Sequence, residues 1–486
     1  MKIRILKGHE EEAQYRDQVI AEYTNNPLIE ALPSIMSQEE TVRLIGNYPA
    51  FSANEKNLPA FQKMHLLGRL NRLVQPLFRH VELEQAISRA IRQGYIARRV
   101  LDPDYTRRKR EDNPLRPQIA LTGMRSSASS FSLVGVSGVG KSTAVERILL
   151  TYPQVIRHYR YKGSNFPFTQ IVWLKVECPH DGSLRSLSTF LLQGIDDVLG
   201  TNYQQQYASG RKGTNEILTA FAKLATIHGI GILVIDEIQN LCKCESHGQD
   251  EMLNYFVQLV NQLGLPVLLI GTPKADILLK TQLREARRAC GEGAFYWDRL
   301  DSKDEWPHIV RSLWKYQWTT GHCGLNQQLS DLLYDESQGI TDIAVKLYML
   351  SQWRAINDGK PMINDLIIRQ VLRDYMRPIK PMLDALKSKD VSLIKTYHDL
   401  PIEWNSIYQN AGLTGVVSGD KSLLELGRDK VKDITSAMVD YLLQSGVSQQ
   451  DAHTAVSTVL KNAKHENIKQ LNAQAIQLAF ELQGKK

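Results

Sequence analysis

Between residues 130 and 300, short apolar runs alternate with amphipathic segments of helical period. The apolar runs have the length of strands, and they occur at 131–135, 171–176, 231–235, 266–271 and 294–297. The segments between them predict helices near 141–151, 183–199, 214–228, 249–263 and 275–289. Because strands that alternate with helices form parallel sheets, the pattern predicts an α/β fold with one parallel five-stranded sheet covered on both faces.

The pattern is different on either side of this region. Residues 1–80 alternate short amphipathic pieces with turn signals such as Asn26-Pro27. After residue 303 only helical periodicity remains, near 303–318, 326–337, 340–357 and 363–387, and two or three further helices are expected in 421–483. The expected organisation is a partner-binding arm (1–80), an α/β core (81–302) that opens with a helix at 82–98, an all-α lid (303–390) and a C-terminal helical tail (391–486) that contacts a partner.

Composition narrows the class of protein. The chain has 486 residues, of which 43% are hydrophobic and 23% charged, which are ordinary values for a globular protein. No apolar run approaches the roughly 18 residues of a membrane helix, so no membrane partner is expected. Five scattered cysteines fit a reducing compartment, and we therefore expect a cytoplasmic protein.

Positive charge is concentrated in one stretch. Residues 89–110 contain eight Lys or Arg against two Asp, while the whole chain carries a net charge of +7. Such a run predicts contact with a polyanion, and a solvated helix face followed by a linker is the alternative. The candidate DNA-binding residues here are Arg98, Arg99, Arg107, Arg108, Lys109 and Arg110.

Residues 135–143, Gly-Val-Ser-Gly-Val-Gly-Lys-Ser-Thr, match the pattern G-x-x-x-x-G-K-[ST] and lie between a predicted strand and a predicted helix. The glycines let backbone N–H groups surround phosphates, and Lys141 adds a point charge. The hydroxyl of Ser142 suits Mg²⁺. The expected cofactors are therefore ATP and Mg²⁺. The expected binding residues in this loop are Gly135, Ser137, Gly138, Val139, Gly140, Lys141, Ser142 and Thr143.

The predicted strand at 231–235 delivers Asp236 and Glu237 at its C-terminal end, where open α/β sheets bind ligands. Asp236 is expected to hold Mg²⁺ through water, and Glu237 to polarise the attacking water. No Asn-Lys-x-Asp or Leu-Ser-Gly-Gly segment is present, so the combination resembles the AAA+ class of P-loop ATPases. This resemblance implies that Thr272, at the end of the next strand, orients the attacking water, although a plain turn threonine is the alternative.

The AAA+ resemblance implies two further elements. The first is an arginine before the last strand that completes a neighbouring subunit's site, for which Arg287 or Arg288 is the choice and Arg284 the reserve. A helix end decorated with cations is the alternative. The second is a lid arginine, but Asp342 stands at its position. Lys346, one turn later, is therefore expected to contact the nucleotide instead.

The stretch between Lys141 and Asp236 is long for a minimal AAA+ core, and the helices expected at 183–199 and 214–228 resemble an inserted pair. In the initiator branch of the class such insertions face DNA, whereas a surface hairpin is the alternative. This pair adds three candidate DNA-binding residues, Arg185, Arg211 and Lys212.

Several segments together resemble the TnsC family, the AAA+ regulators of TnsABC-type transposons, which are related to TniB and IstB. The most specific are 23–33 (Tyr-Thr-Asn-Asn-Pro-Leu-Ile-Glu-Ala-Leu-Pro) and 377–383 (Arg-Pro-Ile-Lys-Pro-Met-Leu). Others are 91–95, 135–143, 151–156, 233–239 and 269–274, whereas the tail is not clearly matched.

The resemblance implies an ATPase that forms a ring or helical homo-oligomer on duplex DNA without sequence preference. It further implies that the oligomer links a TnsD/TniQ-type target selector to a TnsA/TnsB-type transposase, with ATP hydrolysis controlling assembly. Two other hypotheses remain open. One is a loader of a replicative helicase or a replication initiator, and the other is a signalling NTPase that does not bind DNA.

Overall fold

A computed structural model of the chain describes residues 6–388 except 97, 111–113, 116–127, 129, 211, 244–245 and 276–292, together with scattered positions between 404 and 478. The chain divides into two compact units, Met1–Ile402 and Glu403–Lys486. The elements described below belong to the first unit. The helix expected at 275–289 and nearly all of the tail expected at 391–486 lie outside the described residues.

The first unit is built around the predicted sheet of five parallel strands, in the order β5-β6-β7-β2-β8. These strands are β2 (Ser130–Gly135), β5 (Trp173–Glu177), β6 (Ile232–Asp236), β7 (Val267–Gly271) and β8 (Ala294–Trp297). Strands β2, β6 and β7 are buried along their whole length. The prediction of one parallel five-stranded sheet is confirmed, because every strand pair in it is parallel.

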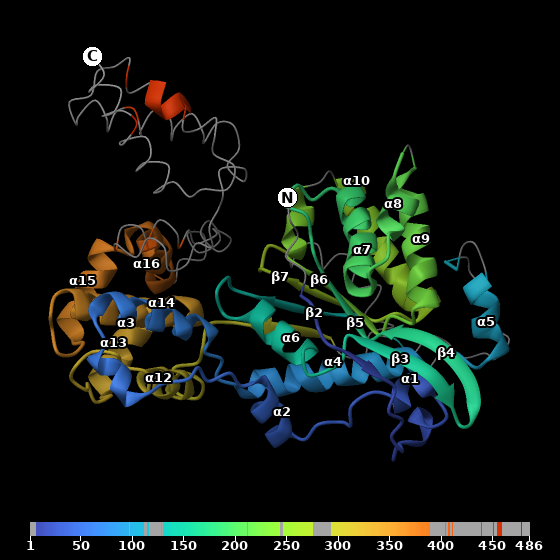
Figure 1. Ribbon diagram of the computed structural model, residues 1–486, viewed down its shortest axis with the longest axis horizontal. Coiled ribbons are helices and arrows are strands. Elements are labelled where there is room, and N and C mark those ends of the chain that lie inside the picture. The colour runs from blue at the N-terminus through green and yellow to red at the C-terminus, as the bar shows by residue number, and fades with distance from the viewer. Residues whose placement is uncertain are drawn as a thin grey trace. The chain divides into compact units, whose positions relative to one another are not determined.

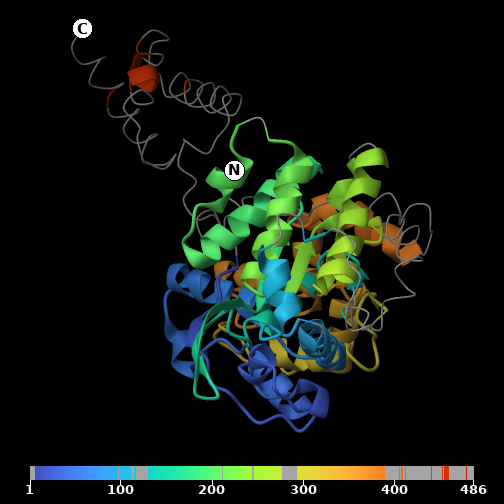
Figure 2. The same ribbon diagram turned by 90° about the vertical axis from the view of Figure 1, so that its right-hand side faces the viewer.

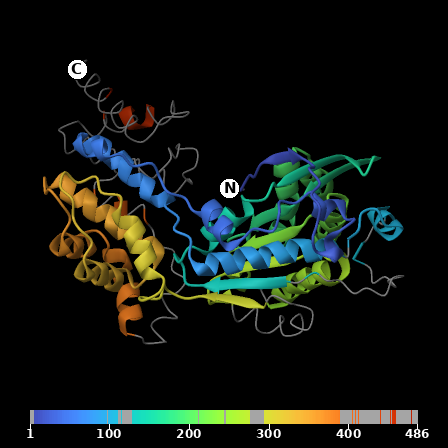
Figure 3. The same cartoon turned by 90° about the horizontal axis from the view of Figure 1, so that it is seen from below.

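Alternate residues of each strand face opposite helical layers. Leu233, Ile235 and Leu269 share one apolar cluster with α7 (Leu184–Leu199), α9 (Thr214–Ile227) and α10 (Ser246–Gln258). On the other face, α4 (Phe78–Ile96) contacts β6 and α6 (Lys141–Leu149). Figures 1 and 2 show the green helices on one side of the sheet and the blue N-terminal elements on the other, and Figure 3 shows α4 in front of the strands.

A second, smaller sheet was not predicted. It has the order β1-β3-β4, formed by β1 (Glu10–Glu12), β3 (Val155–Tyr161) and β4 (Ser164–Ile171). β3 and β4 form a hairpin whose two turn residues, Lys162 and Gly163, both have positive φ, as tight hairpin turns require. The strand expected at 171–176 therefore divides into the end of β4 and β5.

The N-terminal arm is anchored to the rest of the unit. Its helices are η1 (Ala21–Tyr23), α1 (Pro27–Glu30), α2 (Gln38–Ile45), η2 (Ala53–Asn57), α3 (Ala60–Leu67) and η3 (Gly68–Arg72). Asn26 caps α1 and donates its amide to Tyr95 O of α4 at 2.8 Å, while Leu28 is fully buried. The indole of Trp318 donates to Glu55 at 2.9 Å, and α3 contacts α14. The arm thus binds both the sheet region and the lid.

The lid consists of helices, as the periodicity predicted. It contains α12 (Trp306–Trp314), α13 (Gln327–Ser337), α14 (Thr341–Asn357), α15 (Asp365–Asp374), η6 (Arg377–Ile379) and α16 (Lys380–Ser388). The single helix expected at 363–387 is interrupted near Pro378, because proline has no N–H for a helical hydrogen bond.

Two short helices stand in regions where none was predicted. One is α5 (Pro103–Arg110), after the helix expected at 82–98, and the other is α8 (Tyr203–Ala208), between α7 and α9. After α10, a π-helical turn, η5 (Leu259–Leu263), leads to Gly264 in the left-handed conformation. A 3-10 turn, η4 (Ile238–Lys243), follows β6. Among the described residues, no helix is both long enough and apolar enough to span a membrane.

Candidate functional site

The glycine-rich loop connects the C-terminal end of β2 with the first residue of α6. Gly138 and Gly140 have φ values of 82° and 96°, which residues with a side chain rarely adopt. Gly135 lies so close to β8 that an added Cβ would be 2.3 Å from Trp297 O. The Nζ of Lys141 donates to Gly135 O at 2.7 Å and to Val136 O at 2.9 Å. The loop is thus closed around its own lysine.

A cavity of about 300 Å³ opens in front of this loop. Its walls are Ser137, Gly138, Gly140, Lys141, Ser142, Thr143, Asp236, Glu237, Gln239, Gly271, Thr272 and Asp342. The ends of β2, β6 and β7 therefore meet at one place, as expected for neighbouring parallel strands. Gly135, Val139 and Lys346 are not in the cavity wall, and Arg287, Arg288 and the reserve Arg284 lie outside the described residues.

The two acids at the end of β6 have different surroundings. Asp236 is 3% exposed, whereas Glu237 is exposed to the cavity and has a positive φ of 57°. The Glu237 N–H donates to Asp236 Oδ1 at 2.9 Å. A non-glycine residue in the left-handed region costs on the order of 1–3 kcal/mol. The Asp236 carboxylate is thus held inside the fold, whereas Glu237 is exposed and lines the cavity.

Thr272 follows β7, the strand that lies between β6 and β2 in the sheet, and it lines the same cavity. Its N–H donates to Gln239 Oε1 at 3.1 Å. Its hydroxyl Oγ1 is buried and has no hydrogen-bond partner among the residues that the structure describes. A buried hydroxyl without a partner is costly, so this atom fits a site that is completed by water or by a bound phosphate.

Three charged residues beside the cavity were not predicted. Lys175 on β5 is buried, and its Nζ lies 3.0 Å from Asp236 Oδ2 and 2.9 Å from Glu146 Oε1 of α6. Burial lowers the pKa of Lys175, but these two carboxylates outweigh it and the net pKa is raised. Glu177 pairs with Asp236 in the strand register, and its pKa is raised, chiefly by burial. The sequence signal was Lys-Val-Glu at the end of an apolar strand.

The lid reaches the loop through the first turn of α14. The Asp342 N–H donates to Gly138 O at 3.0 Å, and an added Cβ at Gly138 would lie 3.3 Å from Asp342 Cβ. Lys346 Nζ lies 2.5 Å from Asp342 Oδ1. Burial lowers the pKa of Lys346, while Asp342 opposes that shift. The lid residue in the cavity wall is therefore Asp342, and Lys346 stands behind it.

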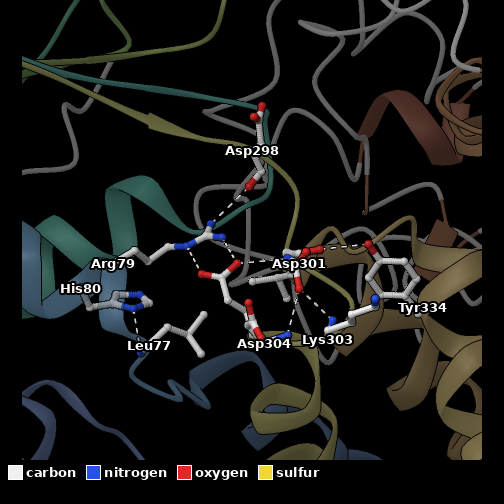
Figure 4. A network of polar contacts seen from close by, with 10 residues as sticks. Leu77, Arg79, His80, Asp298, Asp301, Lys303, Asp304 and Tyr334 are labelled. Atoms are coloured by element: carbon white, nitrogen blue, oxygen red, sulfur yellow. Dashed lines mark hydrogen bonds and ion pairs between the residues drawn. The ribbon is translucent and has the colours of Figure 1, made fainter.

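A polar network at the start of the lid ties it to β8 and α4 (Figure 4). Arg79 of α4 forms an ion pair with Glu305 through two of its nitrogens and donates to Asp298 O at 3.2 Å. Burial, with the Arg79 charge, lowers the pKa of His80 to about 4, so its neutral ring accepts the Leu77 N–H at 2.9 Å. The network fixes the connection from β8, beside the glycine-rich loop, to α12.

One candidate DNA-binding residue is buried and donates to backbone carbonyls. Arg98 is 5% exposed and donates to the carbonyls of Gly94 at 2.8 Å, Ile230 at 2.5 Å and Gly231 at 3.4 Å. Its guanidinium also stacks over the ring of Tyr95. The charge of Arg98 thus satisfies buried carbonyls, and that this residue binds DNA stays a prediction.

The remaining candidates lie at two separate places. Arg107 and Arg110 are exposed on α5, whose Tyr105 donates to Thr226 O near the C-terminal end of α9. Arg185 is exposed and donates to Lys212 O, beside the N-terminal end of α9. With 14 residues, α9 is about 20 Å long, so the structure does not bring the two groups together (Figure 1). Arg99 is partly buried, and Arg211 and the side chains of Arg108 and Lys109 are outside the described residues.

One part of the chain, which includes the glycine-rich loop, matches a family model. Residues 124–279 match the model of a family described as "AAA domain". No curated protein sequence matches the chain.

Among solved structures, the Aeropyrum pernix ORC1 protein in complex with DNA is 12% identical, with a TM-score of 0.42, over 84% of this chain and 85% of that chain. Drosophila ORC bound to DNA is 12% identical, with a TM-score of 0.39, over 78% and 82%. The Thermotoga maritima RuvB Holliday junction branch migration motor is 16% identical, with a TM-score of 0.30, over 59% and 75%.

The domain match coincides with the glycine-rich loop, the acid pair and four of the five strands of the sheet. The matched residues contain four of the parallel strands and the glycine-rich loop that the sequence predicted. The chain therefore contains an AAA+ ATPase domain with the α/β P-loop fold.

Proposed function

We propose that the chain binds ATP with Mg²⁺ in the cavity and hydrolyses the bond between the β- and γ-phosphates. The observation that carries this proposal is that one cavity is lined by the phosphate loop, Asp236, Glu237 and Thr272. Loop N–H groups and Lys141 would hold the phosphates, and Ser142 and Asp236 would hold the metal ion. Bound Mg²⁺ would neutralise phosphate charge.

In this proposal the chain's own residues handle the water. Glu237 accepts a proton from the attacking water, and the free hydroxyl of Thr272 orients that water. The unpartnered Thr272 Oγ1 supports this role, since the hydroxyl of this cavity-lining residue has unused hydrogen-bonding capacity among the described residues. Lys175 holds Asp236 through an ion pair, which keeps the metal-binding carboxylate in one orientation.

We further propose that ATP-dependent assembly on duplex DNA regulates transposition, with a TnsD/TniQ-type selector and a TnsA/TnsB-type transposase as partners. The resemblance of residues 23–33 and 377–383 to the TnsC family supports this role. Residues of the first segment dock onto α4 through a hydrogen bond from Asn26 to Tyr95 O. A helicase loader is the alternative with the same ATPase chemistry.

Turnover of ATP, measured with and without duplex DNA, tests the enzymatic part. Electron microscopy with a non-hydrolysable ATP analogue tests the assembly, for which we expect rings or helical filaments on DNA. The absence of nucleotide-dependent turnover would overturn the proposed activity. Neighbouring genes distinguish the two roles, because transposase genes support the first and a helicase gene supports the second.

Removing the cations of α5 is expected to weaken DNA binding without changing nucleotide binding. Each phosphate contact contributes about −0.9 to the log–log dependence of affinity on salt. Changing Arg107, Arg108, Lys109 and Arg110 to alanine should therefore flatten that slope by about one unit or more. The measurement is a salt titration of duplex binding. The single change Arg185→Ala tests the N-terminal end of α9 in the same way. If the slope of the fourfold α5 variant is unchanged, the DNA contact lies near Arg185 and not on α5.

The trans arginine is expected to act across a subunit boundary. Arginines of this type contribute roughly 10³–10⁵ in rate where they have been measured in NTPases. Each of Arg287→Ala and Arg288→Ala is mixed in turn with Lys141→Ala chains. At least one mixture should recover part of the activity, because each chain supplies the half that the other lacks. No recovery at any ratio, with all chains folded, would indicate sites that are complete within one chain.

A further inference from the structure

Gln239 lies in the cavity wall between the two residues to which we assign handling of the water. Its Oε1 accepts the Thr272 N–H at 3.1 Å, and its Nε2 donates to Glu237 Oε2. Because the amide oxygen already accepts from a backbone donor, the amide NH₂ is the end that faces the carboxylate. One side chain therefore connects the acid after β6 with the backbone after β7.

The backbone of β7 leaves space for this connection. Gly271 is the last residue of β7, and an added Cβ there would lie 3.0 Å from Gln239 Oε1 and 2.7 Å from Ile238 Cγ2. Any side chain at 271 would push the amide away from the Thr272 N–H. The glycine and the glutamine thus belong to the same local arrangement.

The hydrogen bond from Gln239 bears on the position of the Glu237 carboxylate. The Glu237 side chain is exposed, whereas that of Asp236 is buried, and the Glu237 backbone has a positive φ. Within the described part of the chain, the Gln239 amide is the side-chain group that hydrogen-bonds to the Glu237 carboxylate. An exposed side chain without such a bond samples several rotamers, and a general base is effective only within reach of its water.

We propose that Gln239 is a positioning residue that holds the Glu237 carboxylate in the cavity at a fixed separation from Thr272. The inference rests on the proposed ATP hydrolysis and adds a third residue to it. Gln239 forms and breaks no covalent bond. It transmits the position of the end of β7 to the base, so that base and water-orienting residue move together.

Two substitutions separate positioning from folding. Gln239→Ala removes both hydrogen bonds, and we expect kcat to fall at least about tenfold, since small misplacements of reacting groups are costly. The affinity for ATP should change less than about twofold, because the phosphate loop is untouched. Gln239→Glu still accepts the Thr272 N–H but repels Glu237, so kcat should fall at least as far. These outcomes are measured as kcat, KM and nucleotide Kd.

The matched control is Asn240→Ala, in the same 3-10 turn. Asn240 donates to Cys178 O at 3.1 Å and is not part of the cavity wall. A structural role for the turn predicts equal losses of kcat, affinity and melting temperature in Asn240→Ala and Gln239→Ala. That result would overturn the inference.

A double substitution tests whether Gln239 acts through Glu237. If it does, adding Gln239→Ala to Glu237→Gln should lower the rate by less than about twofold, because the group it positions is already gone. Additive losses would place its action elsewhere and overturn the inference. Normal turnover in Gln239→Ala, with wild-type turnover still dependent on Lys141, would also overturn it and leave the proposed function intact. Wild-type protein without any turnover would overturn the proposed function itself.

Discussion

Lys141→Ala should lose nucleotide binding and, with it, assembly on DNA. Among the described residues that line the cavity, Lys141 is the one cationic side chain, and it is largely buried. Hydrogen bonds to charged groups contribute about 1.5–3 kcal/mol each, so affinity for ATP should fall at least about tenfold.

Titration with a fluorescent ATP analogue measures this effect, and Lys243→Ala is the matched control. Lys243 is a neighbouring exposed lysine that donates to His180 O at 2.8 Å and is not in the cavity wall. We expect the control to bind ATP as the wild type does. Equal affinity of Lys141→Ala and wild type would place the nucleotide elsewhere in the protein.

Glu237→Gln should bind ATP and assemble but hydrolyse it very slowly. General bases typically contribute roughly 10²–10⁴ in rate, and glutamine keeps the size of the side chain while losing the group that accepts a proton. The Glu237 N–H that bonds to Asp236 is a backbone group, so the proposed metal site remains. Oligomers of this variant on DNA should therefore be long-lived.

Single-turnover phosphate release measures the step directly, and Glu177→Gln is the matched control. Glu177 carries the same carboxylate one strand away, beside Asp236 in register, and is not part of the cavity wall. We expect its turnover to stay within a few-fold of wild type. Turnover of Glu237→Gln at a similar level would show that Glu237 is not the base.

The sequence by itself predicted the parallel sheet and the parts of the site that are local. A loop of fixed spacing after a strand and a pair of acids after another strand are encoded by neighbouring residues. Parallel strands bring their C-terminal ends to one edge, so the strand pattern alone predicts that Lys141, Asp236 and Thr272 lie close together. The helical lid could be predicted for the same reason, because helical periodicity is a local property.

Contacts between residues distant in the chain were decided only by the tertiary structure. β3 pairs with β1, more than a hundred residues earlier, and no local pattern specifies that partner. Arg98 and Arg107 look alike in a run of cations, yet one satisfies the carbonyls of Ile230 and Gly231 and the other is exposed. Burial of a charge depends on which distant backbone groups need a donor, and composition does not contain that information.

The finer structure of the site has the same origin. The sequence showed Asp342 where related ATPases have an arginine, but only the fold places its N–H against Gly138 O. Lys175 and Gln239 became part of the site because β5 and β7 lie on either side of β6. The sequence determines the chemistry of each side chain, but strand order determines its hydrogen-bond partner. That order decides which groups lie within about 3 Å of each other.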